Sequence, residues 1–168
     1  MTAADPDPGA PASGTHERDY TPAIYGSLLV TTLIAVQWRG DPSKVFIGLS
    51  LAISVAVFWL THVWSGIVNR RIHGPIRRSD VIEIGTAEAP MLAAPIVPLL
   101  VLAIASILDA PIDTAIAAAL FASIGQLFVW GLAVGRAAHT SWLLAVVVAA
   151  VDCALGFLVV VLKVLVIH

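Results

Sequence analysis

Charged side chains are scarce in this chain. It has 9 lysines and arginines and 11 aspartates and glutamates among 168 residues, so that 12% of the chain is charged and 59% is hydrophobic. A soluble domain is about 25% charged and about 45–50% apolar, so this chain lacks the polar groups to cover a water-facing surface. The composition excludes an ordinary soluble domain and predicts a membrane protein.

Cysteine is nearly missing as well, and so are the motifs of enzymes. Cys153 is the single cysteine, which excludes a disulfide framework and a thiolate metal cluster. A net charge of −2, with no basic stripe interleaved with aromatics, argues against a nucleic-acid partner. The zinc-protease, nucleophile-elbow, P-loop and dinucleotide-binding motifs are absent, as is a dense acidic cluster for magnesium. We therefore expect no enzyme activity, no metal and no cofactor.

Five apolar stretches account for most of the chain. Four of them run for 19 to 25 residues without any Asp, Glu, Lys or Arg, and the fifth has only Asp152 between residues 137 and 162. A bilayer core requires about 20 mainly apolar residues for each spanning helix. The sequence predicts an all-α transmembrane bundle of about five helices, with spans at residues 22–38, 44–68, 89–108, 113–135 and 141–167.

Two polar segments lie outside these spans. Residues 1–20 are rich in Pro, Ala, Gly and Asp and lack the apolar core of a signal peptide, so we expect a disordered tail. Residues 69–88 form the longest connection, and Gly74-Pro75 interrupts any helix there. Asp80 followed by Glu83 resembles a capping box, which predicts a short interfacial helix over residues 80–88 with Asp80 as its cap.

The basic residues predict an orientation in the membrane. With five spans, the N-terminal tail, residues 69–88 and residues 136–140 share one side and carry six arginines. The opposite side carries three basic residues, Arg39, Lys44 and Lys163. Because short cytoplasmic loops are enriched in Lys and Arg, we expect a cytoplasmic N-terminus and an external C-terminus. The expected aromatic belts are Trp64, Trp130 and Trp142 on the cytoplasmic side and Trp38 on the outer side.

Titratable side chains within the spans are the first candidates for function, because burial in lipid is costly. His62 lies about two turns from the cytoplasmic end of the second span, and Glu88 lies at the cytoplasmic mouth of the third. If these spans are neighbours, the two side chains can meet directly or through water. The alternative is a neutral, hydrogen-bonded His62 and a Glu88 that favours the positive end of a helix.

Asp152 is the most deeply placed charged residue. It falls near the middle of the fifth span, so its carboxyl should be protonated or should contact other polar groups. Gln126 of the fourth span lies at a similar depth, and Thr31 and Thr32 of the first span are further candidate partners. A proton or cation site and a buried structural hydrogen bond are the two interpretations.

Other patterns in the spans favour breaks and close packing. Pro95 and Pro98 should kink the third span, and a broken helix in mid-membrane can coordinate ions, although a kink without a ligand is the alternative. Small residues four apart allow helices to approach closely, within the bundle or between subunits. These small-residue stripes are Gly131 with Gly135, Ala145 with Ala149, and Gly48 with Ala52 and Ala56.

The arginines of the long connection have two interpretations. They fix the topology of the chain, and they can also contact anionic lipid headgroups. The candidate lipid contacts are Arg70, Arg71, Arg77 and Arg78.

The order of several short motifs resembles a group of small actinobacterial multi-pass integral membrane proteins. The motifs are Tyr25-Gly26-Ser27-Leu28-Leu29, Phe58-Trp59-Leu60-Thr61-His62-Val63, Glu88-Ala89, Gly131-Leu132-Ala133-Val134-Gly135-Arg136 and Leu162-Lys163. The similarity runs from about residue 22 to the C-terminus, and the chain has Trp64 where the group carries a tyrosine. The group has no assigned activity, so the resemblance implies a bacterial plasma-membrane location and a helical architecture.

Two functional hypotheses follow from these residues. The first is a small permease-like protein that handles protons or cations, with His62, Glu88, Asp152 and Gln126 along a polar path. The second is a structural or accessory subunit that binds itself or another membrane protein through its small-residue helix faces.

Overall fold

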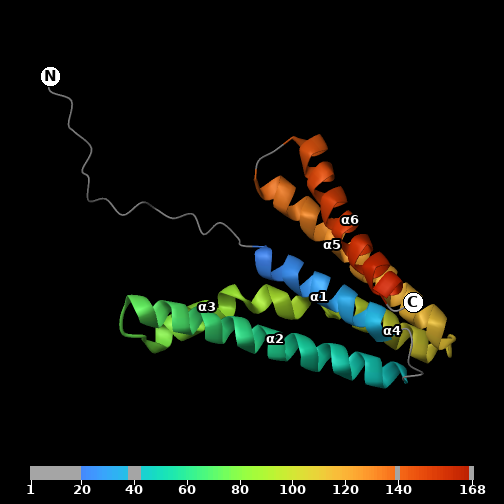
Figure 1. Cartoon of the computed structure of the whole chain (residues 1–168), viewed down its shortest axis with the longest axis horizontal. Helices are drawn as coiled ribbons and strands as arrows, with labels where there is room; N and C mark the ends of the chain where they lie inside the picture. The colour runs from blue at the N-terminus through green and yellow to red at the C-terminus, as the bar shows by residue number, and fades with distance from the viewer. Residues whose placement is uncertain (1–19, 38–42, 139–140, 167–168) are drawn as a thin grey trace.

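The computed structural model describes residues 20–37, 43–138 and 141–166, apart from the side chains at 163, 164 and 166. Residues 1–19 of the tail predicted over residues 1–20, and the predicted outer-side Trp38, lie outside this description. The described residues contain helices only, which confirms the all-α prediction (Figure 1). The elements in order are α1 Thr21–Gln37, α2 Lys44–His73, α3 Arg78–Ala87, the 3-10 helix η1 Ala89–Ala93, α4 Ile96–Ile107, α5 Ile112–Ala137 and α6 Trp142–Val166.

Four segments are long and apolar enough to cross a membrane. They are Lys44–His73, Ala89–Ile107, Ile112–Ala137 and Trp142–Leu162. The first helix, α1, has 17 residues and is the short one that the sequence predicts. At 1.5 Å per residue it is about 26 Å long, a little less than the roughly 30 Å thickness of the hydrocarbon core.

Helix α1 is the central element of the bundle. It packs against α2 and η1 on one side and against α5 and α6 on the other. Consecutive long helices run in opposite directions, and the α2–α3 pair and the α5–α6 pair diverge on the two sides of α1 (Figure 1). The side chains of Val30 and Ile34 on α1 are fully buried, so this 17-residue helix carries part of the core.

Small residues bring α5 and α6 together. A Cβ added to Gly135 would lie 2.5 Å from the Cα of Ala145, and one added to Gly131 would lie 2.7 Å from the Cα of Ala149. Because no real Cβ approaches another carbon that closely, these two glycines permit the contact. The close approach predicted for the two stripes is confirmed, and it occurs within the bundle.

Helix α2 extends five residues beyond its predicted end to His73, with Gly74 as its C-cap, so that Gly74-Pro75 stops the helix as expected. Helix α3 then folds back along α2. Arg70 on α2 pairs with Asp80 on α3 at 3.4 Å, and a Cβ on Gly66 would meet the side chain of Ile84. In each contact the two residue numbers add up to 150, as expected for two antiparallel helices that keep one register over this stretch. We call this α2–α3 pair the hairpin.

The predicted cap of α3 was wrong. Arg77 is the N-cap, and α3 begins at Arg78, two residues before the predicted start. Asp80 instead occupies the third helical position, where its Oδ2 accepts the backbone N–H of Arg77 at 2.9 Å. Asp80 therefore has the role that the capping-box pattern assigned to Glu83, because the helix starts directly after the Gly74-Pro75 turn.

The third span is broken at Pro95. The 3-10 helix η1 precedes it, and α4 begins at the next residue, so Pro95 occupies the cap position. Pro98 is the third residue of α4, a position in the first turn where a helix does not need the missing N–H. Gly26 on α1 packs against this break, since a Cβ there would lie 2.9 Å from the Met91 carbonyl oxygen.

Candidate functional site

Asp152 lies in the seam between α5 and α6. Its helix presents Ala145, Ala149, Asp152 and Gly156 on the face that packs against α5, and a Cβ on Gly131 would collide with the Asp152 carboxylate. Asp152 is ten residues from the start of α6, which is about 15 Å along the axis and half of a hydrocarbon core. The glycine opposite therefore leaves space for a carboxyl in mid-membrane.

The Asp152 carboxyl has an unsatisfied oxygen. Among the described residues, its Oδ2 is buried and has no hydrogen-bond partner, and the same is true of Gln126 Oε1 and Trp130 Nε1 on α5. Gln126 and Trp130 are four residues apart and share a helix face. The ring of Trp130 packs against Tyr20, just before α1, with 6.1 Å between centroids. We call Gln126, Trp130 and Asp152 the polar seam.

Unsatisfied polar atoms at this depth are costly. A buried donor or acceptor without a partner costs about 1–3 kcal/mol, and more when it is charged. A carboxyl in hydrocarbon is stable when it is protonated or when it holds a cation. The Asp152 carboxyl can be satisfied by a proton, a water molecule or a small cation, and the Gln126 oxygen and the Trp130 N–H can each be satisfied by water.

The predicted partner Thr31 contacts other residues instead of Asp152. Its hydroxyl lies 2.8 Å from the Ser27 carbonyl oxygen and 3.0 Å from the Ser123 hydroxyl of α5. The Ser123 hydroxyl in turn bonds to the Leu120 carbonyl at 2.8 Å. Ser27 and Ser123 were not singled out from the sequence, although Ser27 and Thr31 are four residues apart on one helix face. These buried hydroxyls connect α1 to α5.

His62 belongs to a second site, where α1 meets α2. Its Nδ1 lies 3.2 Å from the Phe58 carbonyl oxygen, and since a carbonyl only accepts, Nδ1 carries the proton. The His62 ring packs 4.6 Å from the ring of Phe58 and 6.4 Å from that of Tyr25 on α1.

Glu88 directly follows α3 and is its C-cap residue. The contacts that set the register of α3 against α2 join residue 70 to 80 and residue 66 to 84, and they do not extend to residue 88. The indole of Trp59 also donates to the Gly85 carbonyl of α3 at 3.4 Å, one turn from both residues. Within the described part of the chain, no hydrogen bond or ion pair joins His62 to Glu88.

The two sites lie on different sides of α1. Helix α2, with His62, packs against α1, α3, η1 and α4, whereas α6, with Asp152, packs against α1 and α5. A groove of about 350 Å³ lies elsewhere, between Lys44 at the start of α2 and Ser106 near the end of α4. The structure therefore separates Asp152 from His62, and among the described residues no hydrogen bond joins Gln126 to Asp152 or Glu88 to His62.

The predicted lipid-contacting arginines are exposed at the end of the hairpin. Arg70 forms the ion pair with Asp80, and the other three surround the turn between α2 and α3. These arginines lie outside both the site around Asp152 and the site around His62.

Neither metal-binding groups nor known relatives add a functional assignment to the described residues. The described residues contain no group of three or more His, Cys, Asp or Glu side chains that could hold a metal ion. Cys153 bonds to the Ile124 carbonyl across the α5–α6 seam at 3.5 Å, which is a packing role. Comparison of the chain with protein-family models, curated protein sequences and solved structures found no match.

Proposed function

We propose that this chain is a multi-pass integral protein of a bacterial plasma membrane, of the actinobacterial kind that its motifs resemble, and that it handles protons or cations. Asp152 is the ion-binding carboxyl in this proposal. The observation that carries it is the buried Asp152 Oδ2, which lacks a partner among the described residues and lies over Gly131 in mid-membrane. The N-terminus is cytoplasmic and the C-terminus is outside.

The neighbours of Asp152 have defined roles in this proposal. Gln126 Oε1 adds a second acceptor for a cation or a water molecule, and Trp130 Nε1 donates to a water or to the carboxylate. His62 and Glu88 form a separate titratable pair near the cytoplasmic end, where a proton enters or leaves. Helix α1 lies between the two sites and contacts both.

Flux measurements in liposomes test the proposal. The purified protein is reconstituted, and proton, Na⁺ and K⁺ flux is measured for the wild type and for Asp152→Asn, His62→Ala and Asp113→Asn. Asp113 is an exposed acid in the first turn of α5, so Asp113→Asn is the same chemical change outside the seam. We expect Asp152→Asn to reduce flux to the level of protein-free liposomes, His62→Ala to reduce it in part, and Asp113→Asn to leave it unchanged. Background flux in the wild type itself would refute the proposal.

A second candidate function is a structural or accessory membrane subunit, either a homo-oligomer or the partner of another membrane protein. The observation that favours it is the separation of His62 from Asp152 on the two sides of α1. In that case the polar seam is a packing feature, and Asp152→Asn leaves co-purifying proteins unchanged. Crosslinking in native membranes followed by purification distinguishes this subunit from a transporter that acts alone.

A further inference from the structure

The turn of the hairpin carries an excess of positive charge. Asp80 is the acid nearest the turn, and both of its oxygens are occupied, one by Arg70 at 3.4 Å and the other by the Arg77 backbone N–H at 2.9 Å. Arg71, Arg77 and Arg78 are exposed and have no carboxylate partner among the described residues. We call these three residues the arginine tip.

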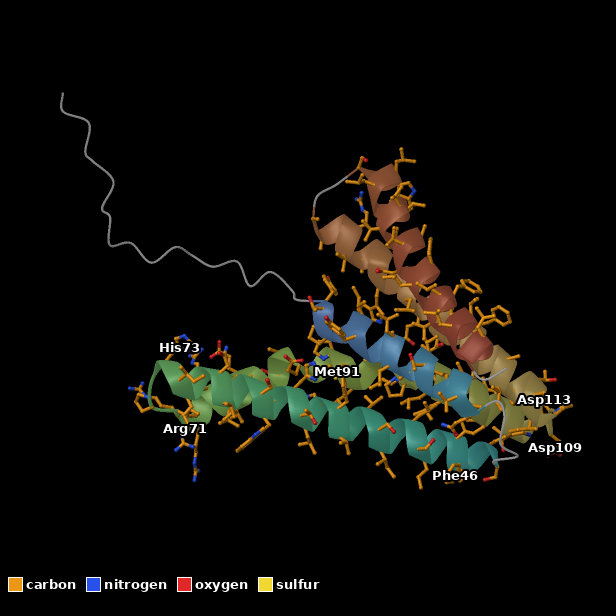
Figure 2. The ribbon with its side chains drawn as sticks, viewed as in Figure 1. Phe46, Arg71, His73, Met91, Asp109 and Asp113 are labelled. Atoms are coloured by element: carbon orange, nitrogen blue, oxygen red, sulfur yellow. The ribbon has the colours of Figure 1, made fainter. Side chains whose placement is uncertain are left out.

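The turn of the hairpin brings the arginine tip together from two helices. Arg71 lies in the last turn of α2, Arg77 is the N-cap of α3 and Arg78 is its first residue. Arg71 is the neighbour of Ile72 on α2 and lies with His73 at one end of the hairpin (Figure 2). The Arg70–Asp80 pair fixes α3 against α2, so that the three guanidinium groups are held around one turn.

The length of α2 places the tip at the level of lipid headgroups. Residues 45–69 form a charge-free run of 25 residues, which is about 37 Å of helix. The hydrocarbon core is about 30 Å thick, and the bilayer with its headgroup regions is about 40–45 Å thick. Residues 70–78 therefore lie beyond the hydrocarbon but within the headgroup region. Trp64 is exposed just below them, where interfacial tryptophans are enriched.

Apolar side chains stand exposed near these arginines. Ile72 is 76% exposed and Ile82 is 66% exposed, on the two helices of the hairpin. In water these isoleucines would remain exposed and would not stabilise the protein. If the tip lies among the headgroups, they are buried at the edge of the acyl chains, which is favourable. Positive charge and exposed apolar surface at one end are the combination that an anionic lipid surface fits.

We propose that the arginine tip binds the phosphate groups of anionic phospholipids in the leaflet that it faces. The planar guanidinium groups of Arg71, Arg77 and Arg78 hold phosphodiester oxygens in bidentate hydrogen bonds, and Ile72 and Ile82 contact the acyl chains. Arg70 is excluded from the site because Asp80 neutralises it. This inference is independent of the proposed ion handling, since no residue of the polar seam takes part.

The test measures lipid selectivity at the protein surface. The full chain is reconstituted in phosphatidylcholine bilayers, and the association of spin-labelled phosphatidylglycerol is compared with that of spin-labelled phosphatidylcholine. The variants are Arg71→Gln/Arg77→Gln/Arg78→Gln, the same three positions changed to Lys, and Arg136→Gln. Arg136 is a matched control, because it is a basic residue at another connection that packs 5.5 Å over the ring of Trp142.

We expect the wild type to favour phosphatidylglycerol, by up to about a hundredfold if each arginine contributes its usual share. The triple Gln variant should lose this preference, the Lys variant should keep part of it, and Arg136→Gln should keep nearly all of it. Circular dichroism of each variant confirms that its helices are intact, and the single change Arg71→Gln serves if the triple variant does not fold. Equal selectivity in the wild type and the Gln variants would overturn the inference, as would displacement of the lipid by millimolar inorganic phosphate.

Discussion

The close contact between α5 and α6 predicts that the substitution Gly135→Ala destabilises the protein. The added Cβ would lie 2.5 Å from Ala145 Cα and 2.8 Å from Ala145 Cβ. Carbon atoms pack best about 3.5–4.0 Å apart, so the two helices must separate by about 1 Å at this point. Overpacking of this kind costs about 1–3 kcal/mol. Because lipid tails are as apolar as the helix faces, van der Waals contact is a main force holding the two helices together.

Gly125→Ala is the matched control for this substitution. Gly125 lies on the same helix, and a Cβ there would meet nothing within 4 Å. Both substitutions replace a helical glycine with alanine and gain the same helix propensity, so that gain cancels in the comparison. Gly135→Ala should therefore be less stable than Gly125→Ala by about 1–3 kcal/mol.

The difference can be measured by equilibrium unfolding in mixed micelles with increasing sodium dodecyl sulfate, followed by circular dichroism. Gly131→Ala should cost at least as much as Gly135→Ala, since its Cβ would meet both Ala149 and the Asp152 carboxylate. If Gly135→Ala proves as stable as Gly125→Ala, the close α5–α6 contact described above is incorrect.

Two further predictions concern the hydroxyl contact of α1 and the cap of α3. Thr31→Val should lower the free energy of unfolding by about 0.6 kcal/mol and at most about 1.7 kcal/mol, because the Thr31 hydroxyl crosses to α5. Thr32→Val should cost less, since the Thr32 hydroxyl bonds only within its own helix, and equal losses would contradict the cross-helix contact. Asp80→Ala should cost about 1 kcal/mol through loss of the Arg77 backbone contact and the exposed ion pair, whereas Glu83→Ala should change stability by less than about 0.5 kcal/mol. Thermal unfolding in detergent measures both, and a neutral Asp80→Ala would exclude the capping role.

Much of the helical architecture could be predicted from composition and spacing. Lipid imposes a strong constraint, since a spanning segment must be both apolar and helical, and the charge-free runs therefore mark the long helices. The close approach at Gly131 and Gly135 could also be predicted, because small residues four apart allow helices to approach closely, whereas Ala52 and Ala56 of the third stripe are exposed. These features depend on local sequence, and the structure has them near the predicted positions.

Features that depend on tertiary packing were harder to predict. The pairing of Asp80 on α3 with Arg70 on α2 is a contact that sequence spacing does not specify. The separation of His62 from Asp152 depends on α1 lying between α2 and α6. Ser123 bonds to Thr31 from 92 residues away, so no local pattern indicates the pair.

The protonation of Asp152 in a lipid bilayer is the most direct test of the central claim that this carboxyl binds a proton or a cation. Infrared difference spectroscopy of the reconstituted protein, with Asp152→Asn to assign the band, follows the carboxyl as pH and the concentrations of Na⁺ and K⁺ change. We predict a carboxyl band that is lost on raising the pH or on adding a cation and that Asp152→Asn lacks. A band that stays protonated and unchanged under all these conditions would mean that Asp152 is a structural hydrogen-bonding residue, and would contradict the claim.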